Sequence, residues 1–238
     1  MKEKLHTIPV NEAFDTDCEC PLCVMHKSLE DKAIDFTMGP SYMEDDVRGE
    51  TSRLGFCQKH LEQLYQNQNR LGLALILKSH MDLLMKEVVK QTGANGKLPV
   101  PSLLKKKGEQ SGLSTHLEKV MSTCYICEKI ENTFERYMAT IFHLYRTEKE
   151  FQHKFTACKG FCTNHYSLLH SLAPKFLRGE ELKDFIKELD TLYIENMKRV
   201  RDDLEWFINK FDYRYAEEPW KNAKDALTRA MLKTNSII

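Results

Sequence analysis

The chain has 238 residues, of which 42% are hydrophobic and 29% are charged, a composition typical of soluble globular proteins that bury a core. Its 35 basic residues balance 35 acidic residues, so no global field draws the chain to nucleic acid or anionic lipid. The N-terminal segment lacks an apolar run of signal-peptide length, and the most apolar stretch, 71–77, is too short to span a membrane. We therefore expect a cytoplasmic protein, in which eight cysteines indicate metal or redox chemistry rather than disulfides.

The first half of the chain is predicted to be helical around two motifs. The first motif is Cys20-Pro-Leu-Cys23, followed by a helix over 42–54 that Ser41 caps and Gly55 ends. The acidic residues of this helix are expected to form a solvated face: Glu44, Asp45, Asp46 and Glu50. A motif of the form GFCxxH then opens a long helix that starts at Phe56 or Cys57 and runs toward Val89. Its predicted buried residues are Leu61, Leu64, Leu71, Leu75, Leu84 and Val88.

The segment 91–113 is rich in Gly, Pro and Lys and lacks periodicity, which predicts a linker. Its three consecutive lysines, 105–107, are expected to be solvated. After it, Thr115 and Glu118 form a capping box that opens a short helix. A long amphipathic helix is predicted from Glu180, and a last amphipathic helix over 220–234. The last helix is expected to place Trp220, Ala223, Leu227, Ala230 and Met231 on its apolar face, packed on the body, and Lys221, Lys224, Arg229 and Lys233 largely on the other.

The chain contains an internal duplication. A CxxC pair followed by a GFCxxH element occurs in both halves, in the same order and at nearly the same spacing. Cys18 aligns with Ser122, and Cys158 aligns with Arg53. The other cysteines and two of the histidines recur, so we interpret Cys18 and Cys158 as additional residues. Five other histidines do not recur and are not expected to be ligands: His26, His80, His143, His153 and His170.

The recurring residues predict two structural Cys₃His zinc sites, one in each half of the chain, with two Zn²⁺ per chain. The i, i+3 spacing of the GFCxxH ligands places them on one face of a helix start. Three thiolates and a neutral imidazole leave the zinc site with a charge of about −1, which helix N-termini stabilise. The predicted sets are Cys20, Cys23, Cys57 and His60, and Cys124, Cys127, Cys162 and His165.

Cysteine motifs of this kind also occur in three other types of site besides zinc sites. A c-type haem requires CxxCH, but Val24 and Glu128 follow the two CxxC motifs. A thioredoxin-like dithiol motif normally follows a β-strand, and it would not explain the two GFCxxH elements. An iron–sulfur cluster stays open as the alternative cofactor, with Cys18 or Cys158 as substitute ligands. We find no GxGxxG, Walker, GxSxG or HExxH motif.

Several segments together resemble an uncharacterised bacterial domain-of-unknown-function family: CECPLC, GPSYMEDDVR, GFCQKH, NRLGLAL, CYICEKIENTFERY and KGFCTNHY. The resemblance extends from about Lys4 to Tyr215 and implies a cytosolic bacterial protein. Some members carry the label of an ABC transporter substrate-binding protein. That label conflicts with the missing signal peptide, lipidation cysteine and α/β pattern of this chain. The resemblance supports the architecture and implies no activity.

These observations predict an all-α, internally duplicated protein with two long helices. The expected divisions are a first repeat over 1–90, the linker over 91–113, a second repeat over 114–215 and a C-terminal amphipathic helix over 216–238. The expected function is that of a non-catalytic, zinc-binding interaction or scaffold module, with no catalytic residue. The alternative is a cytosolic redox or metal sensor that uses Cys18 and Cys158. A protein partner is left open, nucleic acid is not expected, and the oligomeric state is not specified.

Overall fold

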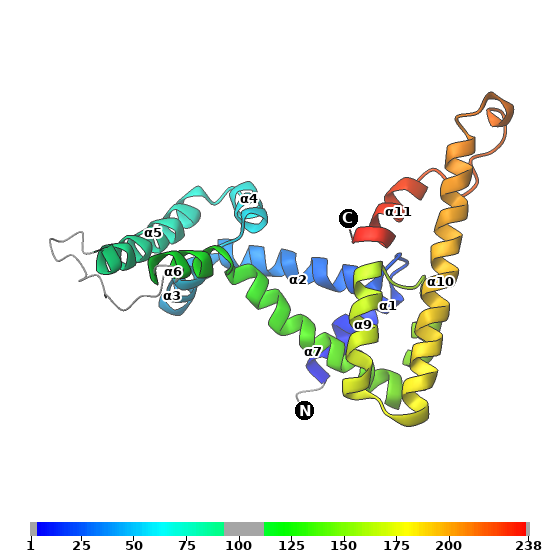
Figure 1. The fold of residues 1–238 in the computed structure, drawn as a ribbon, viewed down its shortest axis with the longest axis horizontal. Coiled ribbons are helices and arrows are strands. Elements are labelled where there is room, and N and C mark those ends of the chain that lie inside the picture. Colours follow the sequence, from blue (N-terminus) through cyan, green and yellow to red (C-terminus); the bar gives the residue numbers. More distant parts are fainter. Residues whose placement is uncertain (1–3, 93–111, 237–238) are drawn as a thin grey trace, which may run out of the picture. The chain divides into compact units, whose positions relative to one another are not determined.

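The computed structural model describes residues 4–92 and 112–236, which contain eleven α-helices and no strand (Figure 1). The all-α prediction is therefore confirmed. The elements are α1 Lys4–Asp15, α2 Pro21–Met38, the 3₁₀ turn η1 Pro40–Met43, α3 Asp45–Leu54, α4 Gln58–Gln66, α5 Arg70–Thr92, α6 Gly112–Met121, α7 Tyr125–Thr147, α8 Lys149–Ala157, α9 Thr163–Phe176, α10 Gly179–Asn209, the 3₁₀ turn η2 Tyr213–Tyr215 and α11 Ala226–Asn235. Most of the predicted linker, residues 93–111, lies outside the described residues, together with its lysine run.

The order of the helices repeats. Helices α1 to α5 and helices α6 to α10 follow the same plan, with a CxxC motif at the start of α2 and α7 and a GFCxxH motif at the start of α4 and α9. Each plan ends in a long helix, α5 or α10. The duplication seen in the motifs therefore extends to the secondary structure, and α11 lies beyond the second copy.

The helices form two compact units that do not coincide with the two sequence repeats. Unit 1 consists of residues 1–28 and 133–238, and unit 2 consists of residues 29–132. The boundaries fall within α2 and α7. Each unit therefore combines the first helix of one repeat with the later helices of the other: α1 contacts α8 in unit 1, and α6 contacts α5 in unit 2. We call α1 with the start of α2, and α6 with the start of α7, the N-terminal arms of the two repeats. The repeats have exchanged these arms, as protomers do in a domain swap.

The core of unit 1 is aromatic and lies between the arm of the first repeat and the body of the second. Phe14 of α1 lies 4.9 Å, centroid to centroid, from Phe151 and 6.0 Å from Phe155, both of α8. Phe155 also lies 5.2 Å from Phe185 of α10 and is fully buried, as is Phe185. Edge-to-face and offset aromatic pairs of this kind stabilise a core beyond the area that they bury. Helices α9 and α10 pack together in the same unit.

In unit 2 the predicted long helix after Gly55 is two helices. Helix α4 ends at Gln66, Gln68 has a left-handed backbone (φ 70°), and α5 begins at Arg70. Asn69 explains the restart, because its side chain accepts a hydrogen bond from the Gly72 N–H at 2.9 Å, as a capping residue does.

The break shifts the buried face of α5 relative to the prediction. Leu73 and Ile76 are buried, whereas Leu71 is 66% exposed and Leu75 is half-buried. Leu64 of α4 is buried as predicted.

Three other helix boundaries differ from the prediction. The segment after Gly39 forms the turn η1, and α3 begins at Asp45, so Ser41 does not cap it. Thr115 lies inside α6, which begins no later than Gly112. The last helix begins at Ala226 rather than Trp220, and it packs on α9 and α10.

The predicted burial pattern of the last helix is only partly present: Ala223 is buried and Lys221 and Lys224 are exposed as predicted, but three residues of α11 are reversed. Lys233 is 1% exposed, whereas Leu227 and Met231 are 51% and 42% exposed. The Lys233 ammonium donates to the Glu19 carbonyl at 2.6 Å and lies 3.3 Å from the Glu19 carboxylate. This ion pair and this hydrogen bond compensate for burial of the Lys233 charge.

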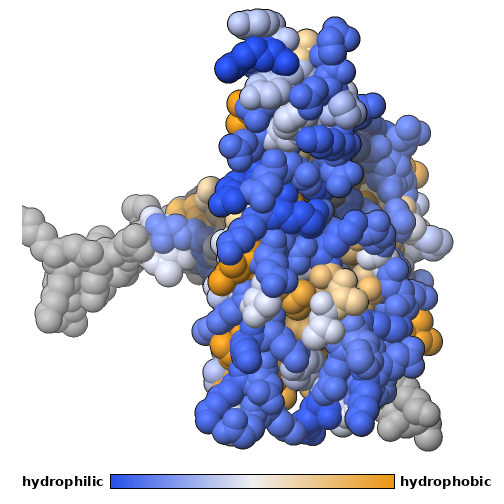
Figure 2. Space-filling view, turned by 90° about the vertical axis from the view of Figure 1, so that its right-hand side faces the viewer, coloured by the Kyte–Doolittle hydropathy of each residue, from blue (hydrophilic) through white to orange (hydrophobic). Residues whose placement is uncertain are grey.

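No helix among the described residues is long and apolar enough to cross a membrane. The face of the molecule in Figure 2 is mostly hydrophilic, with small hydrophobic areas between hydrophilic residues. Helix α10 contributes both kinds of residue to its outer side, for example exposed Ile194 and Lys198. This pattern is that of an amphipathic helix at a protein surface.

Candidate metal centres

Four helix starts carry the eight predicted ligands. Cys20 and Cys124 directly precede α2 and α7, and the second cysteine of each CxxC motif lies in the first turn. Cys57 and Cys162 occupy the N-cap positions of α4 and α9, with nearly identical backbone angles, and a histidine follows in the first turn of each helix. The predicted placement of all eight residues at helix N-termini is therefore present in the structure.

The glycine before each GFCxxH cysteine is needed for the turn. Gly55 and Gly160 have φ angles of 62° and 74°, in the left-handed region that favours glycine. There is also no room for a side chain: a Cβ on Gly160 would lie 2.9 Å from the Leu192 carbonyl oxygen, and one on Gly55 would lie 2.9 Å from the His80 ring. Glycine therefore lets the chain turn from one helix into the next without the strain that a side chain would cause at these positions.

The structure brings the eight residues together in two groups of four, but not in the predicted sets. Each group combines the CxxC motif of one repeat with the GFCxxH motif of the other. The prediction of one complete site in each half is therefore wrong, because the exchanged arms carry the CxxC motifs with them. Cluster A consists of Cys20, Cys23, Cys162 and His165, and cluster B consists of Cys57, His60, Cys124 and Cys127.

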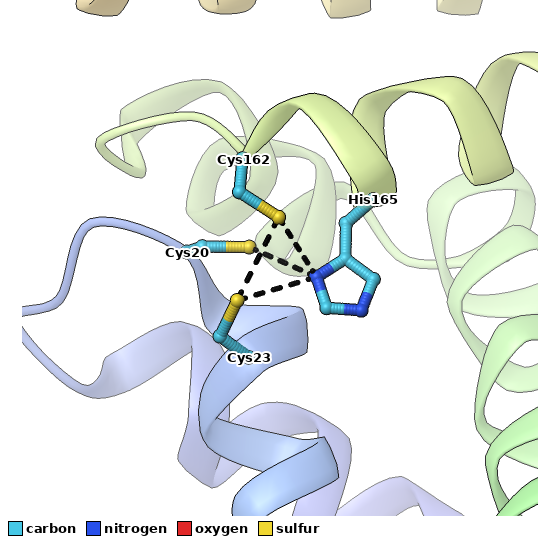
Figure 3. A group of neighbouring side chains, drawn as sticks. All are labelled: Cys20, Cys23, Cys162 and His165. Atoms are coloured by element: carbon cyan, nitrogen blue, oxygen red, sulfur yellow. Dashed lines mark hydrogen bonds between the residues drawn. The ribbon is translucent and has the colours of Figure 1, made fainter. Parts of the chain in front are cut away.

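Cluster A lies entirely within unit 1. The Nδ1 atom of His165 is 3.4 Å from the sulfur of Cys20, 3.3 Å from that of Cys23 and 3.2 Å from that of Cys162 (Figure 3). The sulfurs of Cys23 and Cys162 are 3.7 Å apart. All four side chains converge on one point between the starts of α2 and α9.

Cluster B lies entirely within unit 2 and repeats this geometry. The Nδ1 atom of His60 is 3.3 Å from each of the three sulfurs, those of Cys57, Cys124 and Cys127. The sulfurs of Cys57 and Cys127 are 3.9 Å apart. In both clusters the histidine therefore turns the same ring nitrogen toward three sulfurs.

These distances fit one tetrahedral ion per cluster. With Zn–S bonds of about 2.3 Å and Zn–N bonds of about 2.0–2.1 Å, a tetrahedron has S–S edges of about 3.8 Å and S–N edges of about 3.5 Å. All donor atoms of a cluster lie within 4.8 Å of one another. Three soft thiolates with an imidazole form a donor set that suits zinc and does not suit magnesium or calcium.

Burial and the neighbouring cysteines set the protonation of the cluster thiols when no metal is bound. Burial is the main cause that raises the pKa of Cys20, and the hydrogen bond with Cys162 raises the pKa of Cys23 to about 12. Hydrogen bonds from the same two thiols lower the pKa of Cys162. In cluster B, burial and neighbouring cysteines raise the pKa of Cys127 to about 12. Such crowded sulfurs do not all ionise by themselves, whereas a divalent cation makes the thiolates favourable.

A carboxylate supports the histidine of cluster B. The Nε2 atom of His60 lies 3.1 Å from Oε1 of buried Glu30, which also accepts hydrogen bonds from Lys59 at 2.6 Å and Gln63 at 3.2 Å. Burial by itself would raise the pKa of Glu30, but these donors lower it to about 2. An ionised Glu30 holds the proton of His60 on Nε2, which leaves Nδ1 free for a metal. The sequence analysis missed Glu30, because a single glutamate on α2 belongs to no motif.

The two additional cysteines are not members of either cluster. Cys18 and Cys158 are half-buried, and burial is the main cause that raises the pKa of both, that of Cys158 to about 11. Glu19 and Lys159 directly follow these two cysteines, and the Lys233 ammonium donates to the carbonyl oxygens of both. The acidic residues predicted on α3 are exposed, and Glu50 pairs with Arg53.

The whole chain, residues 1–238, matches the model of a family described as a family of unknown function (DUF6062). No curated protein and no solved structure matches it. The resemblance to a domain-of-unknown-function family is confirmed over the full length.

Proposed function

Since the chain belongs to the DUF6062 family, whose function is unknown, we propose its role from the geometry of the two clusters. It is a zinc-binding helical protein whose two structural sites hold its exchanged repeats together as a non-catalytic interaction or scaffold module. The observation that carries this proposal is the tetrahedral spacing of four protein donors in each cluster. A structural zinc has four protein ligands, whereas a catalytic zinc keeps a position for water.

The charge of three thiolates also supports a structural role. Thiolates donate strongly to zinc, which weakens the ion as a Lewis acid and makes a bound water harder to ionise. The helix N-termini around each cluster stabilise its net negative charge. An iron–sulfur cluster is disfavoured, because its four ligands are divided among two or more iron atoms and, as a set, are spaced more widely than the four donors of one ion.

Elemental analysis and cobalt substitution test this proposal. We expect two zinc ions per purified chain, and intense tetrahedral cobalt absorption that cyanide and azide leave unchanged. Iron in the purified protein would contradict the choice of metal. A five-coordinate cobalt spectrum on adding either anion, with all of the cobalt still bound to the protein, would reveal an open coordination position and would favour a hydrolytic site.

A redox sensor is the second candidate, and one contact favours it. The Lys233 ammonium donates to the carbonyl oxygens of Glu19 and Lys159, the residues that directly follow Cys18 and Cys158. On this reading an oxidant such as a peroxide would oxidise these two thiols before the metal ligands. Peptide mapping after mild peroxide treatment tests it: unmodified Cys18 and Cys158 beside oxidised ligands would exclude the sensor.

A further inference from the structure

The two clusters differ in how far water reaches their sulfurs. In cluster A, Cys20, Cys23 and Cys162 are 1%, 3% and 0% exposed. In cluster B, Cys127 is exposed and Cys57 is half-buried. The clusters share one ligand set and one geometry, so this contrast does not come from the coordination itself.

Helix α11 covers cluster A. Its C-cap residue, Ser236, places Oγ 3.0 Å from the sulfur of Cys162 and accepts a hydrogen bond from Asn164. Thr163 donates to the carbonyl oxygen of Lys233, which fixes the end of α11 over the start of α9. The Lys233 ammonium also donates to the carbonyl oxygen of Glu19, the residue directly before Cys20. An incoming ligand would have to displace this helix to reach the metal.

Cluster B has a fixed inner half and an accessible outer edge. His60 is 4% exposed and is held by Glu30, and Cys124 is 6% exposed. The other two ligands, Cys57 and Cys127, lie 3.9 Å apart along the edge that solvent reaches. A ligand from solution can approach along this edge while His60 and Cys124 keep their positions.

We propose that cluster B exchanges its zinc with thiol compounds from solution, whereas cluster A retains its ion. This inference rests on the proposed zinc sites and adds a second role, zinc donation and acceptance, to one of them. In the exchange step the incoming sulfur forms a bond to zinc as the bond from zinc to Cys127 breaks. The proton of the incoming thiol passes to the released Cys127 sulfur, and zinc remains Zn²⁺, so no oxidant or reductant is needed.

The test uses the full-length protein loaded with two zinc ions, a chromogenic zinc chelator in excess, and glutathione as the thiol. We expect one equivalent of zinc to leave in a fast phase that glutathione accelerates, and the second to leave in a slow phase that it does not. Alkylation with N-ethylmaleimide, followed by peptide mapping, should modify Cys57 and Cys127 during the fast phase. Cys20, Cys23 and Cys162 should remain protected until the slow phase.

A pair of matched variants assigns the phases without removing a ligand. Glu30→Gln removes the charge behind His60 and should weaken zinc binding at cluster B by about 10–100-fold, so that only the fast phase accelerates. Ser236→Ala removes the contact of α11 with Cys162 and should affect the slow phase alone.

Release of both ions in one phase, or alkylation of the cluster A cysteines first, would overturn this inference and leave the structural zinc sites intact. Purified protein that holds no zinc would instead overturn the proposed function itself.

Discussion

The exchange of arms makes a strong prediction for the isolated second repeat. A fragment of residues 114–215 contains Cys124, Cys127, Cys162 and His165, which looks like one complete ligand set. In the structure these residues belong to two different clusters, two ligands to each. We therefore expect the fragment not to fold as a zinc-binding monomer.

The magnitude follows from the buried residues that the fragment lacks. In unit 1 the arm of the first repeat contributes four large buried side chains, Val10, Phe14, Leu22 and Met25. At about 1.5–3 kcal/mol each, their loss costs about 6–12 kcal/mol, which is comparable to the whole stability of a typical domain, about 5–15 kcal/mol. Structural zinc binding adds about 10–16 kcal/mol in small zinc domains, and the fragment also loses this contribution.

Circular dichroism and size-exclusion chromatography during zinc titration measure this outcome. The fragment alone should show weak helicity and no cooperative melting as a monomer. Mixing it with a fragment of residues 1–92 should restore helicity and give a 1:1 complex with two zinc ions. A monomeric 114–215 fragment that binds one zinc tetrahedrally and unfolds cooperatively would refute the exchanged ligand sets.

Two substitutions test the contacts around cluster A. Cys162→Ser removes one thiolate of cluster A, so the charges of the buried ion and of the other thiolates are no longer balanced. It should lower the free energy of unfolding by about 3–5 kcal/mol and the melting temperature by about 6–20 °C. Cys158→Ser serves as its control in thermal scans and should have a much smaller effect; equal losses would contradict the ligand assignment. Lys233→Met leaves the carbonyl oxygens of Glu19 and Lys159 without their buried donor, while Arg199 still pairs with the Glu19 carboxylate, and should destabilise by about 1–3 kcal/mol in urea unfolding. The matched change at exposed Lys224 should be nearly neutral, and an equally neutral Lys233→Met would show that its buried hydrogen bonds contribute little.

The sequence predicted the eight residues that form the two clusters and the helix starts that carry them, but it did not predict which of these residues lie together. Spacing within a motif is local, and the i, i+3 geometry of Cys57 and His60 follows from one turn of helix. Whether Cys57 and His60 lie beside the CxxC motif of Cys20 or beside that of Cys124 depends on which N-terminal arm packs against the later helices of the first repeat. The sequence of the two repeats is the same whether each cluster forms within one repeat or between the two repeats. The repeat by itself therefore does not show that the N-terminal arms are exchanged.

The other differences have the same origin in long-range contacts. The burial of Lys233 depends on Glu19, which lies 214 residues earlier in the chain, and an amphipathic pattern places a lysine in solvent by default. The break before α5 depends on the capping side chain of Asn69, whose amide also bonds to the Met38 carbonyl. Both interactions override a periodicity that by itself favours a different burial or a longer helix.

The ligand exchange also sets an order of events during synthesis. Cys23 and Cys162 are 139 residues apart, so at roughly 5–20 residues per second the first CxxC motif waits about 7–28 s for its proper partner to be made. Cys57 and His60 emerge from the ribosome much earlier and carry the same donor atoms. The nascent chain therefore meets a complete but incorrect ligand set first. If that set held zinc, the ion would have to be released before either native unit could close, and early metal supply would then slow the maturation of this protein.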